Sequence, residues 1–231
     1  MSISMHEVRK ILDKKIVQLN DIIADIDHVL TQMETDFYRV SIFGSARIKE
    51  GSPSFTEVHH LAYELSMRGV DIVTGGGPGL MQAANKGAQE GGHKSRSIGL
   101  AIKLPFEGDP NLHLDVKRNH RRFSSRLDEF MRISHAVVVT PGGIGTLLEL
   151  FYTWQLIQVG HIKPRPIILM GGESMWPELL DWIHKWPLKM ELMSQEDLQH
   201  VTFCSTVNDV VKSLEPKIKD FRQKSSKKNP H

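Results

Sequence analysis

The sequence predicts an α/β protein with a doubly wound parallel sheet covered by helices on both faces. Short apolar runs of four to six residues alternate along the chain with longer segments of helical periodicity. Several of these runs end in a glycine-rich turn that leads into the next helix. Strands that alternate with helices in this way pair in parallel and are connected by right-handed crossovers. One further helix is expected in front of this sheet.

The helix in front of the sheet is expected in residues 5–33. Apolar side chains recur at steps of three and four residues from Val8 to Met33, which places them on one helix face. At 1.5 Å per residue this helix is about 40 Å long. The apolar face has two alternative partners, the chain's own domain or a second subunit. Its length favours a role in a homodimer or a larger homo-oligomer.

Six strands and their helices are expected in the remainder of the chain. The helix after the first strand begins near Ser52 or Ser54, and Gly91–Gly92 stops the helix after the second. Residues 118–134 are expected to be a helix, and residues 207–221 the last helix. The expected strands are residues 38–43, 70–73, 97–102, 136–139, 166–170 and 201–204.

No internal repeat or linker divides this pattern, so the sequence predicts three regions. Residues 1–35 are expected to be a helical extension and residues 36–221 a Rossmann-like nucleotide-binding catalytic domain. Residues 222–231 combine lysines with Ser, Asn and Pro, and they are expected to be a basic disordered tail.

The composition argues against several classes of partner. The net charge is +2 with histidine neutral, so neither nucleic acid nor a membrane is expected as a partner. No apolar stretch approaches the ~20 residues that span a bilayer. Cys204 is the only cysteine, which excludes an intramolecular disulfide and fits a reducing compartment. A cytoplasmic protein is therefore expected.

The most informative stretch is residues 140–149, Thr-Pro-Gly-Gly-Ile-Gly-Thr-Leu-Leu-Glu, which follows an apolar strand and opens a helix. Free backbone N–H groups at a helix N-terminus bind phosphate, and glycine lets the phosphate approach closely. Glu149 follows about one turn into the helix, where a carboxylate indicates chemistry beside the phosphate. In the alternative interpretation, the glycines serve only close packing. The expected phosphate-binding residues are Gly142, Gly143, Gly145 and Thr146.

Three loops are expected at the carboxyl edge of the sheet, where ligands of such folds bind. They are Gly44–Ser45, residues 75–79 and residues 142–146. No G-x-G-x-x-G fingerprint and no G-K-[ST] phosphate loop is present. A ligand of mononucleotide size is therefore expected, with substrate contacts from Gly44, Ser45, Gly76 and Gly77.

Three arginines, Arg118, Arg122 and Arg126, are four residues apart and would share one face of the predicted helix. A solvated basic face is the simpler interpretation. This helix leads, however, into the strand before the phosphate turn, so an arginine near its end can approach Glu149. Such a pair suits an N-glycosidase, because a carboxylate stabilises the oxocarbenium character of the ribose and orients water.

No metal site or cofactor is expected. The twelve histidines show no metal-binding spacing such as H-E-x-x-H, and nothing supports a pyridoxal phosphate site. Only His120, beside the arginines, remains a candidate for a role in the site.

Two motifs, Gly75 to Met81 and Pro141 to Glu149, resemble the signatures of the Lonely Guy family, whose members are often labelled lysine decarboxylases. The resemblance implies a Rossmann-type fold and hydrolysis of nucleoside 5′-monophosphates to free base and ribose 5-phosphate. It also implies that Arg126 and Glu149 are catalytic and that Glu107 contacts the substrate. Leu127 and Gln82 depart from the family pattern, where many members have lysine and cytokinin-activating members have glycine.

The expected function is therefore that of a hydrolase, a nucleosidase that acts on AMP or on N6-modified AMP such as a cytokinin riboside monophosphate. The departures leave the base open. The alternative from a different class is a non-catalytic carrier or sensor of a phosphorylated ligand, similar to molybdenum cofactor carriers.

Overall fold

The computed structural model describes residues 5–33, 37–92, 94–102 and 110–228. The chain forms two units, residues 1–36 and residues 37–231. The first contains the single helix α1 (Met5–Met33), as its apolar periodicity predicts. No helix in these described ranges is long and apolar enough to cross a membrane.

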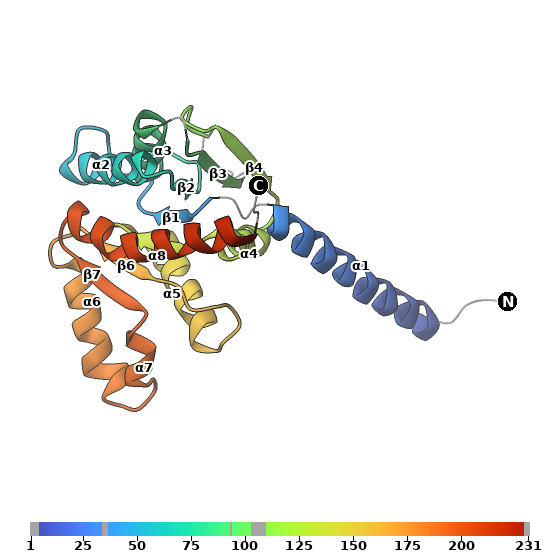
Figure 1. Cartoon of the computed structure of the whole chain (residues 1–231). Helices are drawn as coiled ribbons and strands as arrows, with labels where there is room; N and C mark the ends of the chain where they lie inside the picture. Colours follow the sequence, from blue (N-terminus) through green and yellow to red (C-terminus); the bar gives the residue numbers. More distant parts are fainter. Residues whose placement is uncertain (1–4, 34–36, 93, 103–109, 229–231) are drawn as a thin grey trace. The chain divides into compact units, whose positions relative to one another are not determined.

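The second unit contains a seven-stranded, all-parallel sheet with helices on both faces (Figure 1). The predicted fold class is confirmed. The strands are β1 (Arg39–Phe43), β2 (Asp71–Thr74), β3 (Ser97–Ile102), β4 (Val116–His120), β5 (Ala136–Val139), β6 (Ile167–Met170) and β7 (Val201–Cys204). The helices are α2 (Pro53–Met67), α3 (Leu80–Gly91), α4 (Phe123–Ile133), α5 (Ile144–Gln158), α6 (Met175–Ile183), the π-helical turn η1 (His184–Leu188), α7 (Gln195–Leu198) and α8 (Val207–Lys228).

The strand order is β4-β3-β2-β1-β5-β6-β7. The polypeptide enters the sheet at the central strand β1 and adds β2, β3 and β4 on one side. It then adds β5, β6 and β7 on the other side. The order therefore reverses between β1 and β5, and the crevice at the carboxyl ends of these two strands is where this fold binds ligands.

The core has two layers, one on each face of the sheet. Alternate side chains of the central strands, such as Val138 and Val139, point to opposite faces. Helices α2, α3 and α8 cover one face, and α4, α5 and α6 cover the other. The central strands are buried on both faces, which explains their unbroken apolar runs.

Local sequence signals explain several helix ends. Ser52 caps α2 by accepting a hydrogen bond from the Phe55 N–H at 3.3 Å, and Pro53 occupies the first helical position. Helix α3 ends at Gly91, as predicted.

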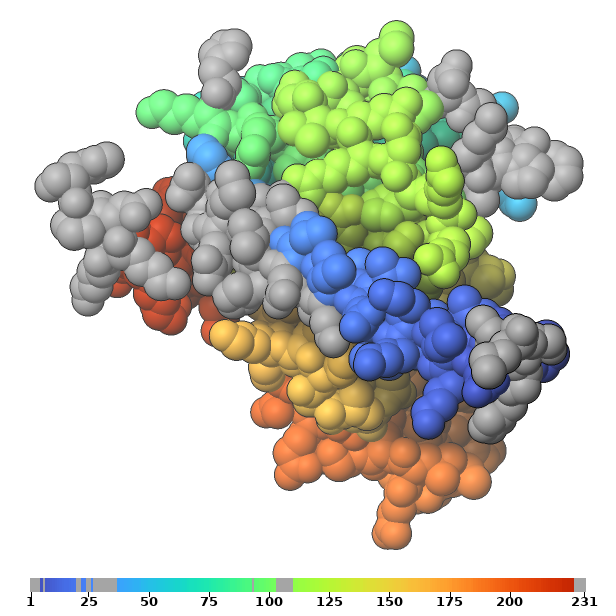
Figure 2. All heavy atoms as spheres, turned by 90° about the vertical axis from the view of Figure 1, so that its right-hand side faces the viewer, coloured from blue at the N-terminus to red at the C-terminus, as the bar shows by residue number. Residues whose placement is uncertain are grey.

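The predicted helix over residues 118–134 is wrong in its first part. Residues 116–120 form β4, which pairs with β3 at the edge of the sheet, and α4 begins only at Phe123. Alternating partial burial along β4 reflects an edge strand, whose polar side chains carry no apolar alternation that sequence reasoning could detect. The region around β4 and α4 lies at the surface (yellow-green in Figure 2). Because Arg118 lies on β4 and Arg122 precedes the first residue of α4, the three arginines Arg118, Arg122 and Arg126 do not share a helix face.

The predicted disorder of residues 222–231 is wrong for residues 222–228, which continue α8. Lysine, arginine and serine tolerate helical structure. An i,i+4 ion pair also supports this part, because Lys224 Nζ lies 2.7 Å from Asp220 Oδ2.

A partly buried aromatic cluster joins α8 to the start of β1. The Tyr38 ring stacks on His135 with centroids 5.1 Å apart, and Phe221 meets His135 edge-on at 4.6 Å. The Arg39 N–H donates to His135 Nδ1 at 3.0 Å. Burial, with a smaller effect of Arg39, lowers the pKa of His135 to about 4. The ring is therefore neutral at physiological pH.

Candidate active site

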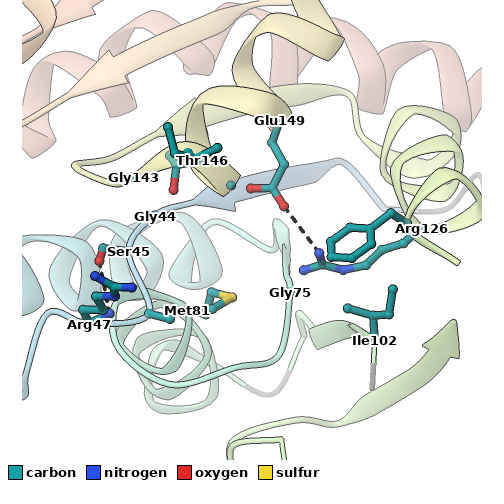
Figure 3. Close-up of a pocket in the computed structure, with 14 residues that line it drawn as sticks. Gly44, Ser45, Arg47, Gly75, Met81, Ile102, Arg126, Gly143, Thr146 and Glu149 are labelled. Carbon is teal, nitrogen blue, oxygen red and sulfur yellow. Dashed lines mark hydrogen bonds and ion pairs between the residues drawn. The ribbon is translucent and has the colours of Figure 1, made fainter. Parts of the chain in front are cut away.

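A pocket of about 560 Å³ opens at the carboxyl ends of β1 and β5 (Figure 3). This volume is in the range of small-molecule sites. The loops after β1, β2 and β5 contribute to its wall, as do α3, α4 and α5. Its lining residues are Gly44, Ser45, Ala46, Arg47, Gly75, Met81, Ile102, Phe123, Arg126, Gly143, Ile144, Gly145, Thr146 and Glu149.

One wall of the pocket is the turn between β5 and α5. Helix α5 begins at Ile144, and no side chain caps it, so the N–H groups of its first turn are available to a ligand. A Cβ on Gly142 would lie 2.1 Å from Thr146 Oγ1, whereas a Cβ on Gly143 or Gly145 would meet nothing within 4 Å. Gly142 thus permits the turn, and the other two glycines leave the approach to the amides open.

The loop after β1 is joined to this turn. Thr140 Oγ1 donates to the Phe43 carbonyl at 2.8 Å, and the Ser45 N–H donates to the Pro141 carbonyl at 3.0 Å. A Cβ on Gly44 would lie 2.2 Å from Thr140 Oγ1. Glycine at this position therefore allows the two loops to meet at the bottom of the crevice.

Arg126 and Glu149 face each other across another part of the pocket (Figure 3). Arg126 Nη1 lies 3.7 Å from Glu149 Oε1, which is an ion pair longer than a hydrogen bond. Arg126 Nε donates to the Leu100 carbonyl at 2.7 Å, and the guanidinium lies over the Phe130 ring. These two contacts fix the position of the Arg126 guanidinium, whose terminal nitrogens point at the Glu149 carboxylate.

The environment of Glu149 changes its ionisation. Burial raises the pKa of Glu149 to about 7, although the Arg126 charge acts in the opposite direction. The side chains of Arg126 and Glu149 are only 11% and 13% exposed. A buried carboxyl group that titrates near neutrality is typical of catalytic groups.

The middle glycine loop contributes less to the pocket than predicted. Gly75 lines it, but Gly76 and Gly77 do not. Their carbonyl groups accept hydrogen bonds from Asn111, at 2.8 Å from its N–H and 2.9 Å from its side-chain amide. They shape the loop because Gly76 has a positive φ of 72°. Glu107 lies outside the described residues.

A family model described as "Possible lysine decarboxylase" matches residues 81–214. The matched segment runs from α3 into α8, and it includes both Arg126 and Glu149. The chain belongs to this family, the Lonely Guy family.

Two proteins of similar sequence support this assignment. Cytokinin riboside 5′-monophosphate phosphoribohydrolase LOG4 of Arabidopsis thaliana is 30% identical over 187 residues, which are 80% of this chain and 85% of that protein. The pyrimidine/purine nucleotide 5′-monophosphate nucleosidase of Escherichia coli (strain K12) is 34% identical over 119 residues. This match covers 48% of the chain but only 26% of the nucleosidase.

Solved structures show the same fold at lower identity. The molybdenum cofactor binding protein from Rippkaea orientalis has a TM-score of 0.56 and 18% identity, and the match covers 79% of this chain and 98% of that chain. At this identity the likeness shows the fold alone.

Several pocket residues lie outside the two Lonely Guy motifs or were not singled out within them. Arg47 lies in the loop after β1, Ile102 at the end of β3 and Phe123 at the start of α4. No spacing rule connects them, because only the order of the strands brings their elements to one edge. For Arg47 a signal was present, since it follows Gly44–Ser45 at the end of the first strand.

His120 lies outside the pocket. Its Nε2 atom is 2.6 Å from Glu129 Oε2, and Glu129 also pairs with Arg118 and Arg132. This cluster joins β4 to α4. Among the described residues no group of three His, Cys, Asp or Glu side chains is arranged to hold a metal ion.

Proposed function

We propose that this protein hydrolyses the N-glycosidic bond of nucleoside 5′-monophosphates and releases the free base and ribose 5-phosphate. The observation that carries this proposal is that the amide-lined turn of α5, Arg126 and Glu149 share one pocket. The names of the Arabidopsis and Escherichia coli relatives support the same reaction class.

The phosphate of the substrate binds the N-terminus of α5, at Gly143, Gly145 and Thr146. Helix N-termini bind phosphate through free N–H groups and the positive end of the dipole. Glu149 follows on the next turn of the same helix, so the ribose, which is covalently linked to the phosphate, lies beside its carboxylate.

In the reaction, the bond between C1′ and the base nitrogen breaks, and its electron pair leaves with the base. Water adds to C1′, and its proton is passed on to the departing base. The ionised Glu149 carboxylate stabilises the positive charge that develops on the ribose and orients the water. Arg126 holds the carboxylate in place, and its charge favours the ionised form.

The proposed substrates are AMP and N6-modified AMP. Incubation with AMP, GMP, CMP and isopentenyl-AMP, followed by chromatography of the free bases, tests the reaction and ranks the bases. If none of the four nucleotides releases its base, the proposed reaction is wrong.

The alternative function is that of a carrier or sensor of a phosphorylated ligand. The molybdenum cofactor binding protein has the same fold. A carrier binds its ligand without turnover and needs no carboxyl group that titrates near neutrality. Tight binding of ribose 5-phosphate together with undetectable base release would favour this alternative.

We also propose that the protein is a homo-oligomer. Ile144, Leu148 and Phe151 form an apolar stripe on the first turns of α5, with exposed fractions of 82%, 46% and 42%. Exposed apolar patches of this kind mark interfaces. Light scattering of the full chain is expected to give a molar mass that is a multiple of 26.2 kDa. In the Leu148→Glu variant this molar mass is expected to decrease toward that of a monomer. The same measurement on a variant without residues 1–34 tests whether α1 contributes.

A further inference from the structure

We propose that Arg47 is a second phosphate-binding group and that it selects the 5′-monophosphate over the corresponding nucleoside. This proposal rests on the proposed function and adds to it a residue outside both family motifs. The site so far described binds the phosphate only through backbone amides and Thr146, without a positively charged side chain.

The first observation is the place of Arg47 in the pocket. Arg47 lies beside Ser45, at the end of the pocket where Gly143 and Thr146 are found, whereas Arg126 lies with Glu149 at the other end (Figure 3). The two arginines therefore serve different parts of a bound nucleotide. Arg126 lies beside the carboxyl group proposed to act on the ribose, and Arg47 lies beside Ser45, on the side of the pocket where the proposed phosphate-binding turn is found.

The second observation is that the backbone carrying Arg47 is fixed in this position from two sides. On one side the Ser45 N–H is bonded to the Pro141 carbonyl, directly before the phosphate turn. On the other side the Leu80 N–H donates to the Ser45 carbonyl at 2.9 Å. A Cβ on Gly79 would lie 2.3 Å from that same carbonyl oxygen, so α3 begins in close contact with the loop.

A further hydrogen bond within the loop sets the direction of the chain at Arg47. The Arg47 N–H donates to Ser45 Oγ at 3.1 Å. This turn uses the Ser45 side chain for structure, so Ser45 supports Arg47 in addition to lining the pocket itself. The loop thus presents Arg47 from a rigid base.

The third observation concerns charge. In the described part of the chain no carboxylate forms an ion pair with Arg47, although its neighbours are paired: Glu50 Oε1 lies 2.8 Å from Lys86 Nζ. The Arg47 side chain is exposed, so an anion can reach it without displacing any carboxylate of the described residues. A guanidinium binds phosphate through two parallel N–H groups.

Ligand selection follows from this arrangement. A nucleoside lacks the phosphate and gains nothing from Arg47. A 5′-monophosphate near neutral pH carries between one and two negative charges, with a second pKa of about 6. The contribution of Arg47 therefore increases as the phosphate loses its second proton.

The test compares wild type with Arg47→Gln, Arg47→Lys and the control Lys49→Ala. Lys49 is an exposed cation two residues further along the same loop and does not line the pocket. Two quantities are measured: KM and kcat for AMP, and the dissociation constant of ribose 5-phosphate by calorimetry. Circular dichroism and thermal melting confirm that each variant is folded.

Arg47→Gln is expected to raise both KM and the ribose 5-phosphate dissociation constant by about 10- to 100-fold, the range for a lost charge-assisted hydrogen bond. The value of kcat is expected to change less than about threefold. Arg47→Lys should recover part of the affinity, and Lys49→Ala should resemble wild type. In wild type the affinity for ribose 5-phosphate should increase from pH 5 to pH 7, and this increase should be smaller in Arg47→Gln.

An unchanged ribose 5-phosphate affinity in Arg47→Gln overturns the proposal. Equal losses for AMP and for adenosine as a competitive inhibitor also overturn it, because they place Arg47 against the base. If wild type releases no base, the proposed reaction fails, but the ribose 5-phosphate titration still decides the role of Arg47. If wild type does not bind ribose 5-phosphate at all, the proposed role of Arg47 is wrong, whereas the proposed reaction is decided by base release alone.

Discussion

At the scale of single residues, the proposed reaction depends most on the ionisation of Glu149. Because burial raises the pKa of Glu149 to about 7, kcat/KM for AMP is expected to fall as the pH decreases below 7 and to level off above it. Glu149→Gln is expected to lower kcat by about 10²- to 10⁴-fold while the binding of ribose 5-phosphate is retained. Base release by Glu149→Gln at the wild-type rate would remove Glu149 from its proposed role.

Gly75 is a second single residue on which the site depends. A Cβ at this position would lie 2.1 Å from Arg126 Nη2 and 2.7 Å from Met81 Sδ. Gly75→Ala is therefore expected to displace the guanidinium and to lower kcat/KM by about tenfold or more. Stability should change little, because both contacts are the ends of flexible side chains.

The control for Gly75→Ala is Gly92→Ala, which lies outside the pocket. There the nearest atom to the added Cβ is the Ser66 carbonyl oxygen at 3.5 Å, an ordinary contact. A parallel loss of activity in both variants would show that the effect is not due to Arg126.

At the scale of elements, the connection between β4 and α4 holds the helix that carries Arg126. Glu129 is 13% exposed and pairs with Arg118, His120 and Arg132. Glu129→Gln is expected to lower the free energy of unfolding by about 3 kcal/mol, because removal of one partner leaves buried charges uncompensated. Chemical denaturation of the variant and of wild type measures this difference.

The matched control is Glu64→Gln on α2. Glu64 pairs with Arg68 at 2.6 Å and with His60, but its side chain is 31% exposed. Solvent screening makes such pairs weak, so a loss below about 1 kcal/mol is expected. If the two variants are equally destabilised, burial does not distinguish the two ion-pair clusters.

How far elements are predictable from sequence depends on whether they face the core. The strands β1, β5 and β6 are buried along their whole length, and apolar residues make up all of β5 and β6. Their predicted bounds agree with the structure to within one residue. Strand β4 has the sequence Val-Lys-Arg-Asn-His, which carries no apolar alternation, and it pairs with β3 at the edge of the sheet. Such an element is specified by tertiary contacts and not by its own pattern.

The residues of the candidate site also differ in how far they can be predicted from the sequence. The predicted phosphate turn and Glu149 lie in one continuous motif, and the resemblance to the Lonely Guy family indicates Arg126. Arg47, Met81 and Ile102 are single residues of three separate segments. Their meeting follows from the reversal of strand order between β1 and β5, which the alternation of strands and helices does not reveal.

At the scale of the whole molecule, two buried groups oppose each other in the pH dependence of stability. The folded chain has His135 with a pKa of about 4, below its ordinary value of 6.5. The unfolded chain therefore binds more protons between these values, and the free energy of unfolding decreases as the pH is lowered from 6.5 to 4. Glu149, whose pKa is raised from 4.5 to about 7, makes the free energy of unfolding decrease as the pH is raised from 4.5 to 7.

Each contribution is on the order of 3 kcal/mol, and their windows overlap between pH 4.5 and 6.5. Wild type is therefore expected to show a weak pH dependence there. In His135→Phe the free energy of unfolding should decrease steeply from pH 4.5 to 7, and in Glu149→Gln it should increase from pH 4 to 6.5. Denaturation at four pH values measures both slopes. Parallel curves for the two variants would contradict this assignment.

The hydrogen bonds between the loops after β1 and β5 have a consequence for how the substrate selectivity of the enzyme can change. At the proposed phosphate site the wall is mostly main chain, and glycines there are required by contacts such as that between Gly44 and Thr140. Further along, the wall consists of replaceable side chains such as Met81, Ile102 and Phe123. We expect exchange of these three side chains to change the selectivity for the base of the nucleotide, because it reshapes this part of the pocket and leaves the proposed phosphate site unchanged.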